Sequence, residues 1–230
     1  MRGRFAPSPT GALHVGNGFT AWVAAYRARG GELALRVEDI DAPRTVPGCE
    51  AQQLADLAWL GLHFDGPLVR QSERYPLYES AVADLVARNL AYYCTCSRKQ
   101  IALASAPHGP EGPRYPGTCR GRREKPALQY AVRFLVREGE VAFNDALFGA
   151  QRQDVSALTG DFVIARADGV YAYQLAVVVD DIAMGITEVV RGADLLVSTP
   201  RQLLLYDALA APPPAFCHVP LVMADGEKLS

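Results

Sequence analysis

Apolar and polar positions near the start of the chain predict a strand, a helix and a second strand in close succession. Residues 2–6 (RGRFA) form a short run that enters a proline-rich turn, and residues 18–29 (GFTAWVAAYRAR) carry apolar side chains at helical spacing. Gly30 and Gly31 then end the helix, and residues 32–37 (ELALRV) predict the second strand. This order is typical of the parallel crossover unit of an α/β sheet.

The pattern changes further along the chain. Helical spacing predicts helices at 52–60 and 76–88, whereas residues 92–125 show little periodicity and hold four prolines, four glycines and three of the five cysteines, as an inserted module would. Beyond Tyr130 the apolar alternation returns and predicts strands at 162–165, 171–179 and 187–190, and a helix at 199–209. We expect an α/β domain in two halves, 1–91 and 166–230, with an inserted subdomain at 92–165.

Composition and charge bound the kind of protein. Half of the 230 residues are apolar and the net charge is only −2, which predicts a globular chain without an overall basic field. The longest apolar runs, such as 175–179, are too short to cross a bilayer and no apolar leader opens the chain, so we expect a cytoplasmic protein without membrane partners. The odd, sparse set of cysteines argues against a disulfide framework.

The turn between the first strand and the first helix, residues 7–17 (PSPTGALHVGN), suits an anion. A helix N-terminus carries unpaired N–H groups, and a parallel sheet binds ligands beyond the carboxyl ends of its strands, where this turn and Glu38 both fall. Gly11 and Gly16 allow a close backbone approach, and His14 has a ring N–H for a phosphate oxygen. Taken alone, the turn is equally compatible with an ordinary strand-to-helix connection.

Five sequence blocks, in order along the chain, resemble those of class I aminoacyl-tRNA synthetases of the glutamyl type. The blocks are RFAPSPTGALHVGN (4–17), LRVEDIDAPR (35–44), YAYQLAVVVDD (171–181), ITEVVRGADLL (186–196) and GEKLS (226–230). Together they span nearly the whole chain, so they are far more specific than any single block. The resemblance implies an α/β fold, a Rossmann-type parallel sheet catalytic domain with an inserted zinc-binding, acceptor-type subdomain. It also implies an enzyme that uses ATP, Mg²⁺, L-glutamate and tRNA.

The same resemblance implies roles for single residues. The glutamate pocket is assigned to Arg4, Phe5, Ala6, Pro7, Ser8, Glu38, Tyr173 and Arg191. In this pocket Arg4 grips a substrate carboxylate and Glu38 receives the α-ammonium group. The ATP site is assigned to His14, Gly16, Asn17 and Lys228. The family pattern continues after Lys228 with a second lysine. Without the resemblance, a solvated acidic turn for Glu38 and a structural ion pair for Arg191 are the simpler interpretations.

Three cysteines and a tyrosine in the inserted segment predict a metal site. Cys94, Cys96 and Cys119 supply three thiols, which suit a tetrahedral zinc with one further ligand; the alternative is a group of reduced, buried cysteines. The Tyr-x-x-x-Cys ending at 115–119 resembles the shorter paralogues of the family, the glutamyl-queuosine tRNA(Asp) synthetases, and implies one zinc with Tyr115 as the fourth ligand. His108 is the rival fourth ligand, because imidazole is a more usual partner of zinc than phenol.

A local excess of cations around this module suits an RNA phosphate backbone, although a solvated basic loop explains it equally well. The cations are Arg114, Arg120, Arg122, Arg123 and Lys125. Cys49, Cys217, His63 and His218 have no partners that the sequence identifies, and we interpret them as structural.

Chain length also bears on the function. A conventional glutamyl-tRNA synthetase needs a further helical domain to read the anticodon, whereas this chain reaches its second ATP signature at Lys228. The resemblance therefore implies a monomer that activates L-glutamate as glutamyl-adenylate and transfers it to the queuosine base of tRNA(Asp). Three alternatives stay open: a truncated conventional glutamyl-tRNA synthetase that charges the tRNA 3′ end, a nucleotidyltransferase that makes a small amide, and a tRNA-binding regulator without activity.

Overall fold

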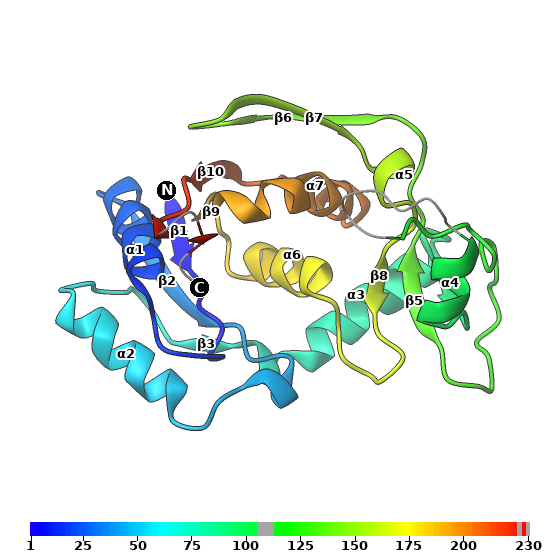
Figure 1. Cartoon of the computed structure of the whole chain (residues 1–230), viewed down its shortest axis with the longest axis horizontal. Coiled ribbons are helices and arrows are strands. Elements are labelled where there is room, and N and C mark those ends of the chain that lie inside the picture. The colour runs from blue at the N-terminus through cyan, green and yellow to red at the C-terminus, as the bar shows by residue number, and fades with distance from the viewer. Residues whose placement is uncertain (105–112, 225–226, 229–230) are drawn as a thin grey trace.

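The first strands of the chain form a parallel sheet around the expected crossover helix. The structure, a computed structural model, describes residues 1–104, 113–224 and 227–228 (Figure 1). β1 (Arg2–Phe5) pairs in parallel with β2 (Glu32–Val37), and β2 pairs in parallel with the short β3 (Val69–Arg70). Helix α1 (Val15–Arg27) connects β1 to β2, which confirms the predicted strand–helix–strand unit. The helix begins at Val15 rather than Gly18, because His14 caps it.

A second sheet lies beside the first and has the order β7-β6-β10-β9. Its strands are β6 (Glu140–Asp145), β7 (Gly149–Asp154), β9 (Glu188–Gly192) and β10 (Ala215–Val219). β9 runs alongside β1 in the same direction, since the Thr187 amide donates to the Arg2 carbonyl at 2.8 Å and Arg4 donates to the Val190 carbonyl at 2.9 Å. The carboxyl ends of β1, β2 and β9 therefore meet at one edge, as a ligand site in an open α/β sheet requires.

A third sheet, with antiparallel strands, lies on the right in Figure 1. It consists of β4 (Ala91–Cys94), β5 (Ala131–Phe134) and β8 (Val163–Ala165), with the short helices α4 (Arg98–Ala104) and α5 (Val155–Leu158) nearby. The hairpin of β6 and β7 also falls between the predicted boundaries of the insert, yet it pairs with β10 of the second half. The division at 1–91, 92–165 and 166–230 stays a prediction.

Longer helices cover the sheets and enclose the core. They are α2 (Cys49–Trp59), α3 (Tyr75–Ala87), α6 (Tyr173–Ala183) and α7 (Thr199–Ala208). The main core cluster joins α3, α6 and α7 through Tyr78, Leu175 and Leu205, which are fully buried. Short elements complete the described chain: η1 (Ala42–Arg44), η2 (Gln71–Glu73), η3 (Ala193–Ser198), β11 (Met223–Ala224) and β12 (Glu227–Lys228). Among the described residues, none of the helices combines the length and apolar character needed to span a membrane.

Residues 171–179, which the sequence predicts as a strand, mostly belong to a helix. From Leu175 to Asp181 every residue of α6 is buried. A segment that is buried on all sides has no polar positions to mark its period, so its β-branched valines do not distinguish a buried strand from a buried helix. α6 packs against both α3 and α7, and this tertiary contact decides its conformation. The strand prediction for this segment is wrong.

Candidate active site

A cleft of about 900 Å³ opens at the carboxyl ends of β1 and β9. Eleven of the twelve residues predicted to bind glutamate or ATP line it. They are Arg4, Phe5, Ala6, Pro7, Ser8, His14, Gly16, Asn17, Glu38, Tyr173 and Arg191. The twelfth is Lys228, whose side chain lies outside the described part of the structure. Segments from both halves of the chain therefore contribute to one cavity, although the ligand that each residue binds stays a prediction.

Arg191, on β9, is a buried cation without a carboxylate partner among the described residues. Its Nε donates to His218 Nε2 at 2.9 Å, and its Nη2 donates to Thr199 Oγ1 at 2.9 Å. The Nη1 atom is buried and has no hydrogen-bond partner. A buried charge without an ion-pair partner costs free energy, and burial lowers the pKa of Arg191, while Tyr173 and the charge of Asp181 oppose the shift. An anionic ligand in the cleft would supply the missing partner.

Arg4 brings a second cation to the same cleft from β1. The residue is 3% exposed, its Nη1 donates to the Val190 carbonyl at 2.9 Å, and its Nε lies 3.5 Å from Asp181 Oδ1. Its side chain therefore contacts both β9, through Val190, and α6, through Asp181. Arg4 and Arg191 thus present two guanidinium groups to one cavity.

Glu38 is the acidic residue of the cleft and directly follows β2. Its backbone N–H donates to the Pro7 carbonyl at 2.9 Å, which ties the end of β2 to the turn after β1. Its Oε1 accepts a hydrogen bond from Arg36 Nη2 at 3.1 Å. Burial raises the pKa of Glu38, and the charges of Arg36 and Arg4 oppose that shift. The paired, buried carboxylate is inconsistent with a solvated acidic turn.

His14 caps helix α1, and this contact determines which of its two ring nitrogens carries the proton. Its Nδ1 accepts the Gly16 N–H at 3.1 Å, while the side chain of Asn17 accepts the His14 N–H at 3.0 Å, which completes a capping box. In a neutral imidazole the nitrogen that accepts carries no hydrogen, so the proton lies on Nε2. A Cβ atom at position 16 would lie 2.9 Å from Cε1 of His14. Any residue larger than glycine would therefore collide with the imidazole ring in this position.

The turn after β1 packs on α2, a contact that the sequence did not predict. Gln53 Nε2 donates to the carbonyls of Ser8 and Gly11 at 3.0 and 2.7 Å, and Cys49 Sγ donates to the Gly11 carbonyl at 2.8 Å. Gln53 is 3% exposed and lines the cleft. A buried glutamine among the apolar positions of a predicted helix is the signal that could have found it, since a buried amide needs partners.

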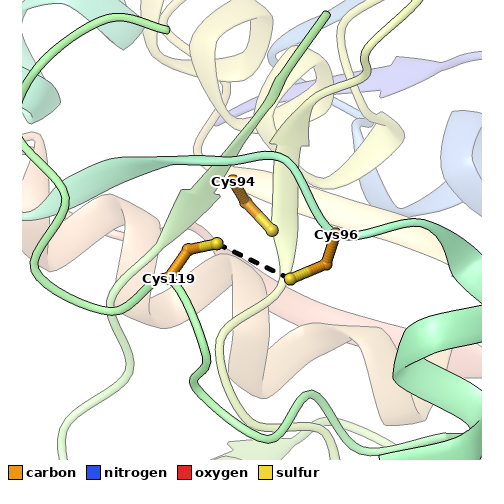
Figure 2. A group of neighbouring side chains, drawn as sticks. All are labelled: Cys94, Cys96 and Cys119. Atoms are coloured by element: carbon orange, nitrogen blue, oxygen red, sulfur yellow. Dashed lines mark hydrogen bonds between the residues drawn. The ribbon is translucent and has the colours of Figure 1, made fainter. Parts of the chain in front are cut away.

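Cys94, Cys96 and Cys119 lie together, as predicted, with their sulfur atoms all within 4.8 Å of one another (Figure 2). The Sγ atoms of Cys96 and Cys119 are 3.5 Å apart, and the Tyr115 hydroxyl lies 3.4 Å from Cys94 Sγ and 3.7 Å from Cys96 Sγ. Sulfur atoms that share a tetrahedral zinc at about 2.3 Å lie about 3.8 Å apart, so the group is close to a ligand set. His108, the rival ligand, lies outside the described residues.

The electrostatic setting differs among the groups of this cluster: burial raises the pKa of Cys96 and of Tyr115, whereas the pKa of Cys119 is lowered. Burial raises the pKa of Cys119, but hydrogen bonds from the Thr95 backbone, Cys96 and Tyr115 outweigh it and bring the pKa to about 7. Arg133 adds a buried cation: its Nε donates to Cys94 Sγ at 3.3 Å and its guanidinium lies over the Tyr115 ring at 3.8 Å. A nearby cation offsets the negative charge that several thiolates bring to a metal ion.

A second cleft of about 640 Å³ joins the first to the cysteine cluster. Both clefts are lined by Ser8, Thr10, Glu38, Arg44 and Tyr173. The second cleft extends to Cys96, Ser97 and Arg98 beside the cluster, and also to Arg166 and Asp168. A molecule in the second cleft would therefore touch both the predicted glutamate pocket and the metal module.

Comparison with known proteins identifies the family. The model of the family described as "tRNA synthetases class I (E and Q), catalytic domain" matches residues 1–230. The glutamyl-Q tRNA(Asp) synthetase of Chromobacterium violaceum is 53% identical over 100% of this chain and 78% of its own length. That of Symbiobacterium thermophilum is 52% identical over 99% of this chain and 77% of its own length.

Solved structures agree with the sequence comparison. A glutamate-tRNA synthetase from Elizabethkingia anophelis matches the whole chain with a TM-score of 0.86 and 31% identity, and a glutamate tRNA ligase from Elizabethkingia meningosepticum in complex with its amino acid does so with a TM-score of 0.87 and 31% identity. This chain spans 52% and 51% of those two proteins. The chain belongs to the class I tRNA synthetases of the E and Q type, in the group of the glutamyl-Q tRNA(Asp) synthetases.

Proposed function

We propose that this chain activates L-glutamate with ATP and transfers the glutamyl group to the queuosine base of tRNA(Asp). The observation that carries the proposal is the buried Arg191 guanidinium, which lines the cleft with an unpaired Nη1 and without a carboxylate partner among the described residues. A substrate carboxylate is the anion that this cation needs. The names of the relatives, glutamyl-Q tRNA(Asp) synthetases, support glutamate as that substrate and queuosine in tRNA(Asp) as the acceptor.

The charges of the cleft complement those of glutamate. At neutral pH the amino acid carries two carboxylates and one ammonium group. Arg4 and Arg191 serve the carboxylates in this proposal and Glu38 serves the ammonium group, while the Tyr173 hydroxyl lies among the charges of these three residues. Glutamine carries a neutral amide in place of one carboxylate and would leave a buried guanidinium unpaired, which supplies discrimination against it.

ATP, with Mg²⁺ on its phosphates, occupies the other end of the cleft in this proposal. There it contacts His14, Gly16 and Asn17, and Lys228 is the fourth residue assigned to it. A carboxylate oxygen of glutamate attacks the α-phosphorus, the bond to the β-phosphate oxygen breaks, and pyrophosphate leaves. The Nε2–H of His14 donates to the α-phosphate as charge develops, so the residues act mainly by positioning and charge neutralisation.

The cysteine cluster holds one zinc ion in this proposal, bound by Cys94, Cys96, Cys119 and Tyr115. The near-tetrahedral spacing of these atoms and the pKa of about 7 for Cys119 support it. Zinc here serves structure, because all four coordination positions are taken by protein groups. It would fasten β4 to the loop at 113–123 and so shape the second cleft, which we assign to the acceptor nucleotide.

Most of the basic side chains near the cluster are bound to uncharged groups. Arg114, Arg122 and Arg123 donate to the Ser156 carbonyl, Thr95 Oγ1 and the Ala91 carbonyl, and Lys125 lies over the Tyr130 ring. Arg120 alone among the five forms an ion pair in the described structure, with Asp161. Four positive charges thus remain to attract RNA phosphates, which supports a tRNA partner. We place the enzyme in the cytoplasm, as a monomer.

The first test separates glutamate activation from folding. We expect Arg4→Ala to abolish glutamate-dependent exchange of pyrophosphate into ATP, because the substrate loses a buried cation. Arg2→Ala is the matched control, two residues earlier on the same strand, where the side chain is 38% exposed and pairs with Glu32. The control should keep both exchange and melting temperature. Undiminished exchange in Arg4→Ala defeats the assignment of the pocket.

The second test identifies the acceptor. The protein is incubated with labelled glutamate, ATP and tRNA that either contains or lacks queuosine. Transfer only to the queuosine-containing tRNA supports the proposal, whereas equal transfer to both indicates a conventional glutamyl-tRNA synthetase. Label that reaches only small molecules indicates a nucleotidyltransferase. A protein that binds tRNA but neither exchanges pyrophosphate nor transfers label is a regulator.

A further inference from the structure

His218 lies between Asp145 and Arg191 in a buried chain of hydrogen bonds. Its Nδ1 is 2.7 Å from Asp145 Oδ2, and its Nε2 is 2.9 Å from Arg191 Nε. The three residues come from the neighbouring strands β6, β10 and β9, and none is more than 4% exposed. The sequence alone indicates a structural role for His218 and no role for Asp145, because the contact between them joins positions 73 residues apart.

Only one assignment of hydrogen atoms satisfies this chain. Asp145 accepts the backbone N–H groups of Leu147 and Phe148 at 3.0 Å each. These bonds, together with His218, lower the pKa of Asp145 although burial raises it, so the carboxylate is ionised and Nδ1 of His218 donates to it. Arginine only donates, so Nε2 of His218 accepts from Arg191. His218 is therefore a neutral imidazole with its proton on Nδ1.

This arrangement fixes the plane of the Arg191 guanidinium before any ligand binds. His218 holds Nε, and Thr199 Oγ1 holds Nη2 at 2.9 Å, which leaves Nη1 unpaired. Arginine has many rotamers in solution, and a side chain that is already fixed loses less entropy when it binds. Arg191 lines the cleft, whereas neither His218 nor Asp145 belongs to the described lining.

We propose that His218 and Asp145 are positioning residues that orient Arg191 for a substrate carboxylate. The proposal rests on the proposed role of Arg191 in glutamate binding. Asp145 selects the tautomer of His218, and the lone pair on Nε2 then holds Nε of Arg191 in place. Loss of the acceptor on His218 lets the guanidinium turn, so glutamate binds more weakly while the ATP site is unaffected.

Two substitutions at position 218 separate the hydrogen bond of Nδ1 with Asp145 from the contacts of Nε2 with Arg191 and Thr199. The amide of asparagine reaches the position of Nδ1 and keeps a donor for Asp145, but it has no atom near Nε2. The amide of glutamine reaches the position of Nε2 and keeps an acceptor for Arg191. We expect His218→Asn to raise the KM for glutamate about tenfold or more in pyrophosphate exchange, with the KM for ATP changed less than about twofold. His218→Gln should raise the glutamate KM less than about threefold.

Further variants make each outcome decisive. The exposed His63→Asn is the control and should match the parent protein. Equal glutamate KM values for His218→Asn and His218→Gln, or an unchanged value for His218→Asn, overturn the positioning role. If His218→Asn does not fold, Asp145→Asn takes its place. The amide of this asparagine donates to Nδ1 of His218, so the ring proton moves to Nε2. The N–H groups of His218 and Arg191 then face each other, and their hydrogen bond is lost. An unchanged glutamate KM in Asp145→Asn would also overturn the positioning role of His218.

Arg191→Lys separates this inference from the proposed function. If it leaves the glutamate KM unchanged, the glutamate pocket itself is wrongly assigned. If Arg191→Lys raises the glutamate KM and His218→Asn does not, the pocket stands and only the positioning role of His218 fails.

Discussion

Nη2 of Arg36 donates a hydrogen bond to Oε1 of Glu38 at 3.1 Å, and no part of the Arg36 side chain is exposed. The same guanidinium lies 2.6 Å from Asp181 and 3.8 Å from Asp180. Burial lowers the pKa of Arg36, but Asp181, Glu38 and Asp180 together raise it above its ordinary value. Arg36 therefore shares Asp181 with Arg4 and Asp180 with Arg74 beneath the cleft, and it holds Glu38 in the orientation that the cleft requires.

Removing this cation should unfold the protein more easily. We predict that Arg36→Met lowers the free energy of unfolding by about 3–5 kcal/mol, because it leaves the buried Glu38 without its ion-pair partner and removes one of the cations beside Asp180 and Asp181. Arg88→Met is the control, since Arg88 and Asp84 form an ion pair with side chains that are 44% and 48% exposed. The control should cost at most about 1 kcal/mol. Urea unfolding measures both, and equal losses would contradict the structural role of Arg36.

Two glycines of α1 differ in what a methyl group would meet. At Gly16 it would lie 2.9 Å from His14 Cε1 and 3.0 Å from Nδ1, whereas at Gly18 it would lie 3.4 Å from Leu60 Cδ1. We predict that Gly16→Ala displaces the His14 ring and raises the KM for ATP about tenfold or more, whereas the KM for glutamate changes little. Gly18→Ala should leave both KM values unchanged and add up to about 1 kcal/mol of stability through helix propensity. An ordinary ATP KM in Gly16→Ala would count against the placement of ATP over His14.

The metal site gives a prediction about composition and stability. We expect elemental analysis to find one zinc per chain in the purified protein and in Cys217→Ser, but not in Cys119→Ser. A chelator should lower the melting temperature of the parent protein and leave that of Cys119→Ser unchanged, because metal binding contributes to folding. Zinc affinity should also weaken as the pH falls, since thiols must lose protons to bind. A metal-free protein whose cysteines all react with a thiol reagent refutes the site.

Local signals made the nucleotide end of the fold predictable. The strands predicted at 2–6 and 32–37 correspond to β1 and β2. Proline follows the first apolar run and glycine precedes the second, which marks where the chain turns. Parallel strands must present their carboxyl ends at one edge, so the turn at 7–17 and Glu38 were bound to meet. Arg4 and Arg191 were placed in one pocket only by family resemblance, because nothing in their local sequence relates β1 to β9.

Contacts between distant segments account for what the sequence left out. β10 follows three prolines, which correctly predict the end of the helix before it but give no sign that residues 215–219 enter the sheet beside β9. The hairpin of β6 and β7 then brings Asp145 to that strand. The partners of His218 are fixed by this topology alone, so its role could not be derived from neighbouring residues.

His218 also gives the protein a pH dependence whose sign follows from its surroundings. Burial lowers its pKa below the ordinary value of 6.5, the charge of Arg191 lowers it further, and Asp145 opposes them. Arg4 adds positive charge at longer range, while Thr199 from α7 and Phe216, which stacks on the ring, are uncharged. The native state therefore binds fewer protons at this site than the unfolded chain does between pH 6.5 and the lowered pKa. Stability must rise with pH across that window and fall as the pH drops through it.

The difference between the parent protein and His218→Gln isolates this contribution. We predict that the difference in unfolding free energy is constant above about pH 7 and then shrinks below pH 6.5, by at most about 1.4 kcal/mol per pH unit, because glutamine does not titrate. Over the same range the glutamate KM of the parent should rise faster than that of His218→Gln, since a protonated imidazole loses its acceptor and repels Arg191. Urea unfolding and pyrophosphate exchange at pH 5.5, 6.5 and 7.5 measure the two effects. A pH-independent difference in stability would show that His218 keeps its ordinary pKa and that burial beside Arg191 does not hold it neutral.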